Sequence, residues 1–267
     1  MPSDAHAHPY DLLQVFPQGE EERRALGISC AASAWNLREF EAQEELARQA
    51  RIDRAAPVLL CFAVHPQLAA APASRVRPSL EALETLVREG RLAGVGETGF
   101  DYYRPDFREA GPFQEELFQT HLELALSGGL PVTLHLRRAM HKAFAHAKAL
   151  GKLPAVIFHA YPGSFEEGLS LLKQGINAYF SFGTALLLNH KTARAACARL
   201  PGERLLLETD APYQPLRGAA FSRWSDLAAI LHGVAALRQE NPAALQAQVD
   251  ANFQRIWPDG LTVNGKR

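Results

Sequence analysis

Short apolar segments alternate with longer amphipathic segments along the whole chain, and this alternation constrains the fold more than any other feature. Several short segments are continuously apolar, as in VLLCFAV at 58–64 and PVTLH at 131–135. Unbroken apolar runs of this length are typical of strands buried on both faces of a parallel sheet. The predicted strands are Pro2–His6, Gly27–Ala31, Pro57–Val64, Leu92–Glu97, Pro131–His135, Ala155–His159, Asn177–Phe182 and Arg204–Asp210.

The amphipathic segments between these strands carry the residues that begin and end helices. Asn36 precedes one such segment as a candidate N-cap, with Glu39 placed to complete a capping box. Ser79 is expected to open a second helix that Gly90 ends. Further helices are predicted over Gln114–Ser127, after Ser164 and after Ser222.

A strand followed by a helix, repeated about eight times, predicts an α/β fold with a parallel sheet. The length of 267 residues is near that of a (β/α)₈ barrel. An open doubly wound sheet is the alternative, but no glycine-rich nucleotide loop follows any strand. No composition break divides the chain, so we expect a single domain. Only five residues precede His6, so the barrel is expected to close imperfectly beside the first strand.

Charge and composition exclude several classes of protein. The net charge of −1 gives no global attraction to nucleic acid, although a local basic patch is compatible with it. The three cysteines are widely spaced and form no CxxC pair, which argues against a disulfide framework or a thiolate zinc site. The start MPSDAHAH does not resemble a signal peptide, and no window approaches 18 apolar residues. We therefore predict a cytoplasmic protein with no membrane contact and no organic cofactor.

Residue types that bind divalent metals lie at the ends of the predicted strands. In a barrel these ends converge on one face. Burying several imidazoles and carboxylates beside apolar strands costs several kcal/mol unless they are paired or bind metal. A metal site therefore explains the set better than separate hydrogen-bonded residues. The candidate ligands are His6, His8, Glu97, His135, His159 and Asp210, and His65 follows the third strand.

The spacing of His6 and His8 adds weight, because alternate residues of an extended segment point the same way and two imidazoles then chelate one ion. Nitrogen and carboxylate donors without thiolate suit Zn²⁺ or Mn²⁺ and accept Mg²⁺. The remaining histidines are expected to be solvated or partly packed helix residues. They are His121, His141, His146, His190 and His232.

The chain resembles the TatD family of metal-dependent hydrolases over nearly its whole length. GVGETGFDYY at Gly94–Tyr103 and LLLETDAPY at Leu205–Tyr213 carry most of the resemblance. The supporting motifs are DAHAH at Asp4–His8, FAVHP at Phe62–Pro66, PVTLHLRRA at Pro131–Ala139, FHAYPGS at Phe158–Ser164 and NFQRIW at Asn252–Trp257.

The resemblance implies a distorted TIM-type (β/α)₈ barrel over residues 1–258, with a C-terminal tail at 259–267. It also implies two divalent ions, Zn, Mn or Mg. His6, His8 and Asp210 would hold one ion, and His135 and His159 the other, with Glu97 bridging both. A metal-activated water would attack the scissile group, with Asp210 as its base; the alternative is that Asp210 is only a ligand.

The chain departs from the family around the substrate. Arg137 is followed by Arg138 where the family commonly has an acid, and Ala160–Gly163 replaces a usual Cys-Phe-Ser-Gly. After ETDAPY the usual Arg-Asn-x-Pro element is missing, and only Arg217 and Arg223 offer a replacement cation. The metal ligands are retained while the substrate rim has changed. A hydrolase is therefore better supported than a nuclease.

Three functions follow. The first is a phosphodiesterase, a DNase with DNA as substrate, using His65, Tyr102, Arg137 and Arg217 for substrate binding. Other loop residues that could meet phosphates or bases are Arg104, Arg108, Arg138, Lys142, Tyr103, Tyr161 and Tyr213. The alternative is hydrolysis of a small amide, ester or lactone on the same metal site. The third, a non-catalytic binding module, is disfavoured by the complete ligand set. The sequence leaves the native metal, the polarity of nuclease action and the oligomeric state open.

Overall fold

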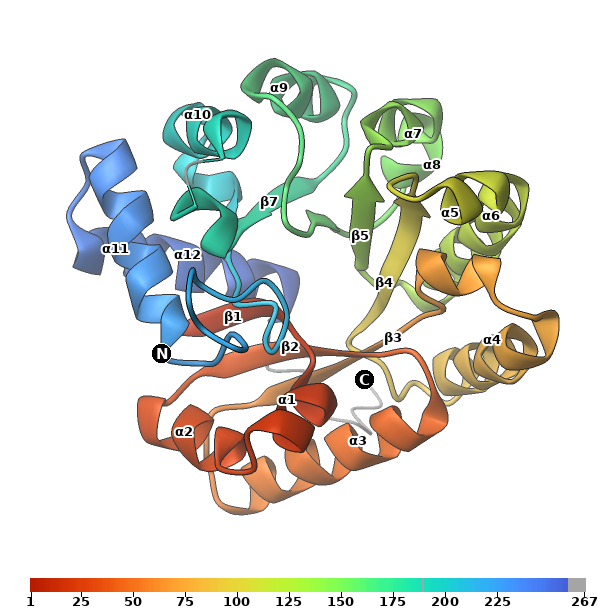
Figure 1. Cartoon of the computed structure of the whole chain (residues 1–267), viewed down its shortest axis with the longest axis horizontal. Helices are drawn as coiled ribbons and strands as arrows, with labels where there is room; N and C mark the ends of the chain where they lie inside the picture. The colour runs from red at the N-terminus through yellow and green to blue at the C-terminus, as the bar shows by residue number, and fades with distance from the viewer. Residues whose placement is uncertain (189, 259–267) are drawn as a thin grey trace.

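The computed structural model of the chain describes residues 1–188 and 190–258, so the predicted tail at 259–267 lies outside the described residues. Eight parallel strands form one sheet in the order β1-β2-β3-β4-β5-β6-β7-β8, in which each strand pairs with its neighbours in the sequence. Figure 1 shows this sheet curled into a nearly closed barrel with helices around its outside. The (β/α)₈ prediction is confirmed, and the open doubly wound alternative is excluded.

All eight predicted strands are present, with some ends displaced. They are β1 Ser3–Ala7, β2 Ser29–Ala34, β3 Val58–Phe62, β4 Gly94–Asp101, β5 Val132–Arg137, β6 Val156–Phe158, β7 Ala178–Phe182 and β8 Leu205–Leu207. The fourth strand runs past Glu97, which was expected to end it. The eighth strand stops at Leu207, so Asp210 lies in the following loop rather than at the strand end.

Most helices lie between successive strands and cover the outside of the barrel. They are α1 Pro9–Val15, α2 Gly19–Leu26, α3 Leu37–Ile52, α4 Ala73–Arg88, α5 Pro105–Glu109, α6 Gly111–Gly128, α7 Met140–Ala145, α8 Ala147–Leu150, α9 Phe165–Lys173, α10 Lys191–Arg199, α11 Asp226–Arg238 and α12 Pro242–Ile256. Short 3₁₀ turns occur at Pro66–Ala70, Thr184–Leu186 and Gly202–Arg204. Among the described residues, no helix has the length and apolar character needed to span a bilayer.

Two of the four predicted N-caps are correct. The Asn36 side chain accepts a bond from the Glu39 backbone N–H at 3.1 Å, but Glu39 accepts the Trp35 N–H at 3.2 Å instead of completing the predicted capping box. Ser164 does form a reciprocal capping box. Ser79 does not open a helix, because α4 already begins at Ala73. The helix continues through Pro78, which has no backbone N–H and therefore removes one intrahelical hydrogen bond. Ser222 is likewise wrong: its hydroxyl donates to the Tyr213 carbonyl and anchors the loop before α11.

The barrel closes between β1 and the segment that follows β8. The Asp210 N–H donates to the His6 carbonyl at 3.0 Å, and the His8 N–H donates to the Ala211 carbonyl at 2.8 Å. Below these bonds, the buried Asp4 carboxylate accepts the Thr209 hydroxyl at 2.6 Å. A side chain and loop backbone thus complete a closure that the short first strand cannot make alone. The expected distortion beside the first strand is confirmed.

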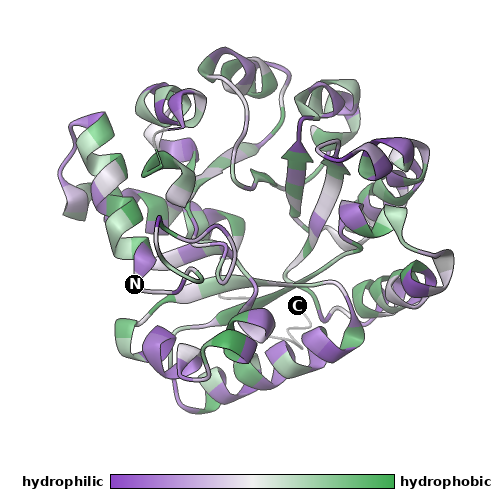
Figure 2. Cartoon of the chain, in the orientation of Figure 1, coloured by the Kyte–Doolittle hydropathy of each residue, from purple (hydrophilic) through white to green (hydrophobic). Residues whose placement is uncertain are grey.

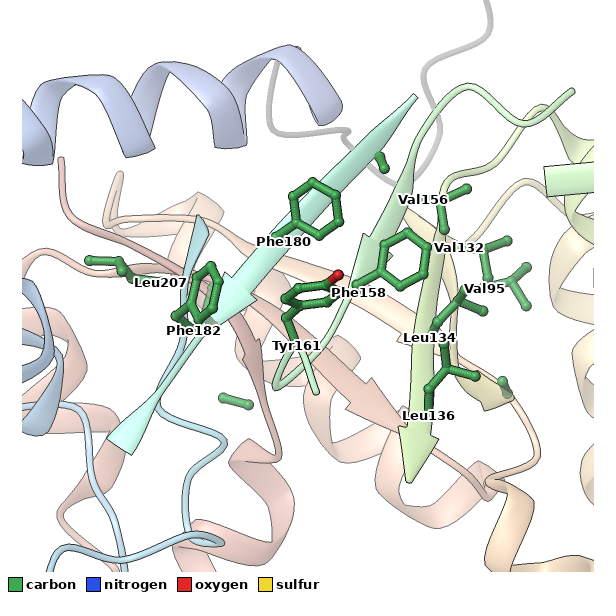
Figure 3. Close-up of a cluster of buried hydrophobic side chains, with 14 of the residues drawn as sticks. Val95, Val132, Leu134, Leu136, Val156, Phe158, Tyr161, Phe180, Phe182 and Leu207 are labelled. Carbon is green, nitrogen blue, oxygen red and sulfur yellow. The ribbon is translucent and has the colours of Figure 1, made fainter. Parts of the chain in front are cut away.

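The side chains of each strand divide between the helix layer and the barrel interior. On β5, Val132, Leu134 and Leu136 face the helices, and Figure 3 shows them on one side of the strand. Figure 2 shows hydrophobic and hydrophilic residues alternating along the helices, as expected for helices with one face on the barrel. The interior holds a separate apolar cluster that includes Leu59, Ile157 and Leu206, together with Phe253 and Trp257 at the end of α12.

Two glycines allow β4 to lie against β5 at the level of the site. A Cβ on Gly96 would lie 2.6 Å from the Thr133 Cβ, and a Cβ on Gly99 would lie 2.3 Å from the His135 carbonyl oxygen. Gly99 also has φ +134°, which L side chains rarely adopt. The glycines of the GETG sequence therefore fix the spacing between the strands that carry Glu97 and His135.

Replacing Gly99 with alanine should lower the free energy of unfolding by about 3 kcal/mol, because backbone strain adds to a steric clash. Gly90 is the matched control: it has φ +65° with nothing within 4 Å of its added Cβ. Gly90→Ala should therefore cost only about 1 kcal/mol. Urea unfolding of both variants measures the difference, and equal losses would contradict this account of the β4–β5 contact.

Candidate metal centre

Glu97 lies at the centre of a buried group of histidines at the carboxyl end of the barrel. Its side chain is 6% exposed, and its two oxygens face different imidazoles. Oε2 lies 3.2 Å from His6 Nε2 and 3.6 Å from His8 Nε2. Oε1 lies 2.5 Å from His135 Nδ1, 3.3 Å from His65 Nε2 and 3.6 Å from His159 Nε2. One carboxylate therefore connects residues from both sides of the barrel.

Asp210 supplies a second carboxylate on the side of β1. Its Oδ1 lies 3.6 Å from His6 Nε2 and 3.5 Å from His8 Nε2. Its Oδ2 lies 3.8 Å from His159 Nε2 and accepts a bond from the Gln214 side chain at 2.7 Å. Asp210 has a left-handed backbone with φ +54°, uncommon outside glycine. The turn carries the chain from β8 back over the barrel mouth.

Three overlapping groups of these residues have donor atoms close enough to hold a metal ion. They are His6, His8 and Glu97; His6, His159 and Asp210; and His65, Glu97 and His135. The six residues predicted as ligands thus come together in space. His65, predicted to contact substrate, lies in the same cluster and places its ring centroid 4.7 Å from that of His135.

The two carboxylates make the site attract positive charge, either as protons on the imidazoles or as a bound metal ion. Burial opposes ionisation of Glu97, yet His65, His159 and His6 hold the pKa of its carboxyl well below the usual range. Burial would lower the pKa of His8, but its contacts with Asp210 and Glu97 raise it to about 10. In the described part of the chain, no lysine or arginine nitrogen lies within 4.0 Å of either carboxylate. Imidazole and carboxylate donors that converge with no lysine or arginine side chain to neutralise them are suited to binding a divalent metal ion.

Two further buried carboxylates, neither of them predicted from the sequence as part of the site, orient the histidines. Glu208 is fully buried; its Oε1 lies 3.0 Å from His159 Nδ1 and accepts the Ala160 N–H at 2.7 Å. Asp101 Oδ2 lies 3.3 Å from His135 Nε2. Burial raises the pKa of Asp101, but bonds with His135 and Gln67 bring it to about 2. Asp101 ends the ETGFD sequence that begins with Glu97, and Glu208 begins the ETD sequence that ends with Asp210. Their places in these two motifs could have identified them as part of the site.

His121 was expected to be solvated or partly packed, and this is wrong. It is fully buried on the inner face of α6, where its Nε2 accepts the Val64 N–H at 3.3 Å. Its Nδ1 lies 2.6 Å from the Thr98 hydroxyl and, in the neutral ring, is the nitrogen that carries hydrogen. His121 therefore fixes the backbone beside His65 and beside Glu97. Its helical spacing from Leu117 and from other buried residues of α6 could have identified it.

A cleft of about 1030 Å³ opens above the carboxylates. His65 and Arg137 line it, whereas Tyr102 and Arg217 are not among its lining residues. Several other residues expected to meet substrate are otherwise engaged. Lys142 pairs with Glu115 at 2.6 Å, Arg104 pairs with Asp106 at 2.9 Å, and Arg108 donates to the Tyr102 carbonyl at 3.3 Å. Tyr161 and Tyr213 both line the cleft, but Tyr161 is otherwise buried whereas Tyr213 is exposed.

Comparisons with known proteins find relatives over most of the chain. A family model described as TatD related DNase matches residues 3–258. The chain is 36% identical over 195 residues to the 3′-5′ ssDNA/RNA exonuclease TatD of Klebsiella pneumoniae, covering 69% of this chain and 72% of the relative. It is 30% identical over 243 residues to a Mycobacterium tuberculosis protein named uncharacterized metal-dependent hydrolase TatD, covering 89% of each.

Solved structures share the fold. The TatD homologue YJJV from Escherichia coli K12 superposes with a TM-score of 0.82 at 24% identity, covering 95% of this chain and 96% of that one. A TatD family hydrolase from Entamoeba histolytica superposes with a TM-score of 0.77 at 17% identity, covering 96% of this chain and 97% of that one. The barrel architecture is therefore shared well beyond the range of clear sequence similarity.

The burial of His121 predicts an acid-sensitive fold. Burial lowers the pKa of His121 to about 3, while in the unfolded chain it returns to about 6.5. Between these values the unfolded chain binds a proton that the folded chain excludes, so stability falls as the pH falls. In EDTA, lowering the pH from about 6 to about 4 should reduce the free energy of unfolding of both proteins. The reduction should be about 1.4 kcal/mol per pH unit larger in the parent than in His121→Gln. If the free energies of unfolding of the parent and the variant changed equally with pH, His121 would not be held neutral in the folded protein.

Proposed function

The chain belongs to the TatD-related DNase family, and from this premise we propose that it hydrolyses phosphodiester bonds of DNA or RNA with two divalent ions. The observation that carries the proposal is the buried Glu97 carboxylate, whose two oxygens face separate sets of imidazoles. A carboxylate in this position is suited to bridging two cations. The relative from Klebsiella pneumoniae is named as an exonuclease of ssDNA and RNA, which supports nucleic acid as the substrate class.

We assign His6, His8 and Asp210 to one ion and His135 and His159 to the other, with Glu97 shared. Support for the first ion comes from Asp210 Oδ1, which lies 3.6 Å from His6 Nε2 and 3.5 Å from His8 Nε2. Support for the second comes from Glu97 Oε1, which lies 2.5 Å from His135 Nδ1 and 3.6 Å from His159 Nε2. When bound, a pair of divalent ions lowers the pKa of water and neutralises charge on the phosphate. Zn²⁺, Mn²⁺ and Mg²⁺ are the candidates.

The chain's own groups supply orientation and proton transfer. Gln214 restrains Asp210 by donating to Oδ2, which leaves Oδ1 facing His6 and His8. In the proposed reaction, water attacks phosphorus while the P–O bond to the leaving oxygen breaks; Asp210 Oδ1 accepts the proton of the water and returns it to the leaving oxygen. Glu208 and Asp101 hold the outer nitrogens of His159 and His135, so that the opposite ring nitrogens point at Glu97. Residues 1–258 form the proposed catalytic unit.

Glu97→Gln and Asp210→Asn should each lower phosphodiesterase activity by at least about 100-fold, since each loses a ligand charge and Asp210 also loses the base. Glu115→Gln is the control, because Glu115 pairs with Lys142 outside the cleft lining. Activity is measured on single-stranded DNA, RNA and simple esters with added Mn²⁺, Mg²⁺ or Zn²⁺. If both site variants match the parent on the best substrate, the proposed site is wrong.

Chelation and salt separate the proposed function from small-molecule hydrolysis. EDTA should abolish activity, and added divalent metal should restore it. Nucleic-acid cleavage below saturation should fall steeply between 50 and 200 mM salt, because phosphate binding releases counterions. Activity that is insensitive to salt and restricted to a neutral amide, ester or lactone would favour the alternative substrate class.

A further inference from the structure

Arg137 and Arg138 place their guanidinium groups around one tyrosine at the mouth of the cleft. The Arg137 Cζ lies 3.6 Å from the centroid of the Tyr103 ring, and the Arg138 Cζ lies 4.8 Å from the same centroid. Tyr103 is 45% exposed and both arginines line the cleft. We call these three residues the arginine–tyrosine stack.

The backbone is turned so that two consecutive side chains meet the same ring. Consecutive residues of an extended strand point to opposite faces, and Arg137 is the last residue of β5. Arg138 adopts a left-handed conformation with φ +58°, which breaks this alternation. Such a conformation costs about 1 kcal/mol at a residue other than glycine. The structure therefore holds two like charges together although both backbone strain and charge repulsion oppose it.

The described part of the chain places no anion against these two guanidinium groups. Among the described residues, no carboxylate oxygen lies within 4.0 Å of the Arg137 or Arg138 guanidinium nitrogens, whereas Arg104 and Arg199 are each paired with an acid. In the described part of the chain they are also the only arginines that line the cleft, and no lysine lines it. Guanidinium groups match phosphate oxygens bidentately. Two unpaired guanidinium groups at a cleft mouth thus form a site for a phosphate.

The position of the stack relative to Glu97 selects which phosphate it meets. Arg137 lies two residues beyond His135 on β5, so its backbone is about 6.6 Å farther toward solvent on the same face. This displacement is comparable with the distance between neighbouring phosphates along an extended single strand of nucleic acid. This backbone offset is the geometric basis for placing a phosphate on the stack one nucleotide away from a phosphate at the carboxylates.

We propose that the arginine–tyrosine stack binds the phosphate next to the scissile one, so the preferred ligands are nucleotides that carry two phosphates. This rests on the proposed function, because it takes the scissile phosphate to lie beside Glu97. The stack would favour strand ends that retain an adjacent or terminal phosphate over ends that lack one.

Calorimetric titration of the manganese-loaded protein tests the proposal. The ligands are thymidine 3′,5′-bisphosphate, thymidine 5′-monophosphate and thymidine 3′-monophosphate. The bisphosphate should bind at least tenfold more tightly than either monophosphate. Arg138→Gln and Arg137→Gln should reduce this ratio to within about twofold of one, and Arg138→Lys should restore part of it. Arg199→Gln is the matched control, because Arg199 stacks at 3.8 Å on Phe165 outside the cleft lining.

Equal affinity of the parent for the three ligands would overturn the proposal, as would a ratio that survives in Arg138→Gln or falls equally in Arg199→Gln. Hydrolysis of thymidine 5′-monophosphate p-nitrophenyl ester by the parent tests the proposed function separately. A parent that prefers the bisphosphate but never cleaves this ester or nucleic acid would contradict the proposed function and leave the phosphate site standing. A parent that cleaves but shows no preference would contradict the phosphate site alone.

Discussion

The carboxylate of Glu97, buried among imidazoles from opposite sides of the barrel, is the interaction on which the rest of the structure depends. A buried charge costs several kcal/mol unless partners surround it. Here the partners come from β1, β5 and the loops after β3 and β6, and these segments meet only when the sheet curls into a barrel. The fold and the site are therefore coupled: a barrel that opened beside β1 would lose His6 and Asp210 together.

The closure beside β1 shows the same coupling in the backbone. The segments that carry His6 and Asp210 bond each other directly, and the buried Asp4 ties Thr209 to the first strand. The bottom of the barrel is filled instead by apolar residues and by Trp257, whose indole N–H donates to the Ala93 carbonyl at 3.0 Å. Stability is thus concentrated at one end of the barrel and the polar site at the other, as in other barrels of this type.

The sequence predicted the eight strands and brought the six proposed ligands to one face, because continuous apolar runs and strand-end residue types are local signals. It did not predict that Glu97 lies in the middle of β4, since the extension of that strand depends on the contact of Gly99 with β5. The burial of His121 and the pairing of Lys142 with Glu115 also depend on partners distant in the chain. Residues that contact the substrate are the hardest to predict from the sequence, because their availability depends on partners that are distant in the chain.

The most direct test of the account is anomalous diffraction from crystals of the manganese-loaded protein. If the two-metal assignment is correct, the map contains two manganese peaks about 3.5–4 Å apart, one on each side of Glu97. One peak should contact Glu97 together with His6, His8 and Asp210, and the other Glu97 together with His135 and His159. No peak at the carboxylates of Glu97 and Asp210, or a single peak that leaves one of the two sets of imidazoles without metal, would contradict the account.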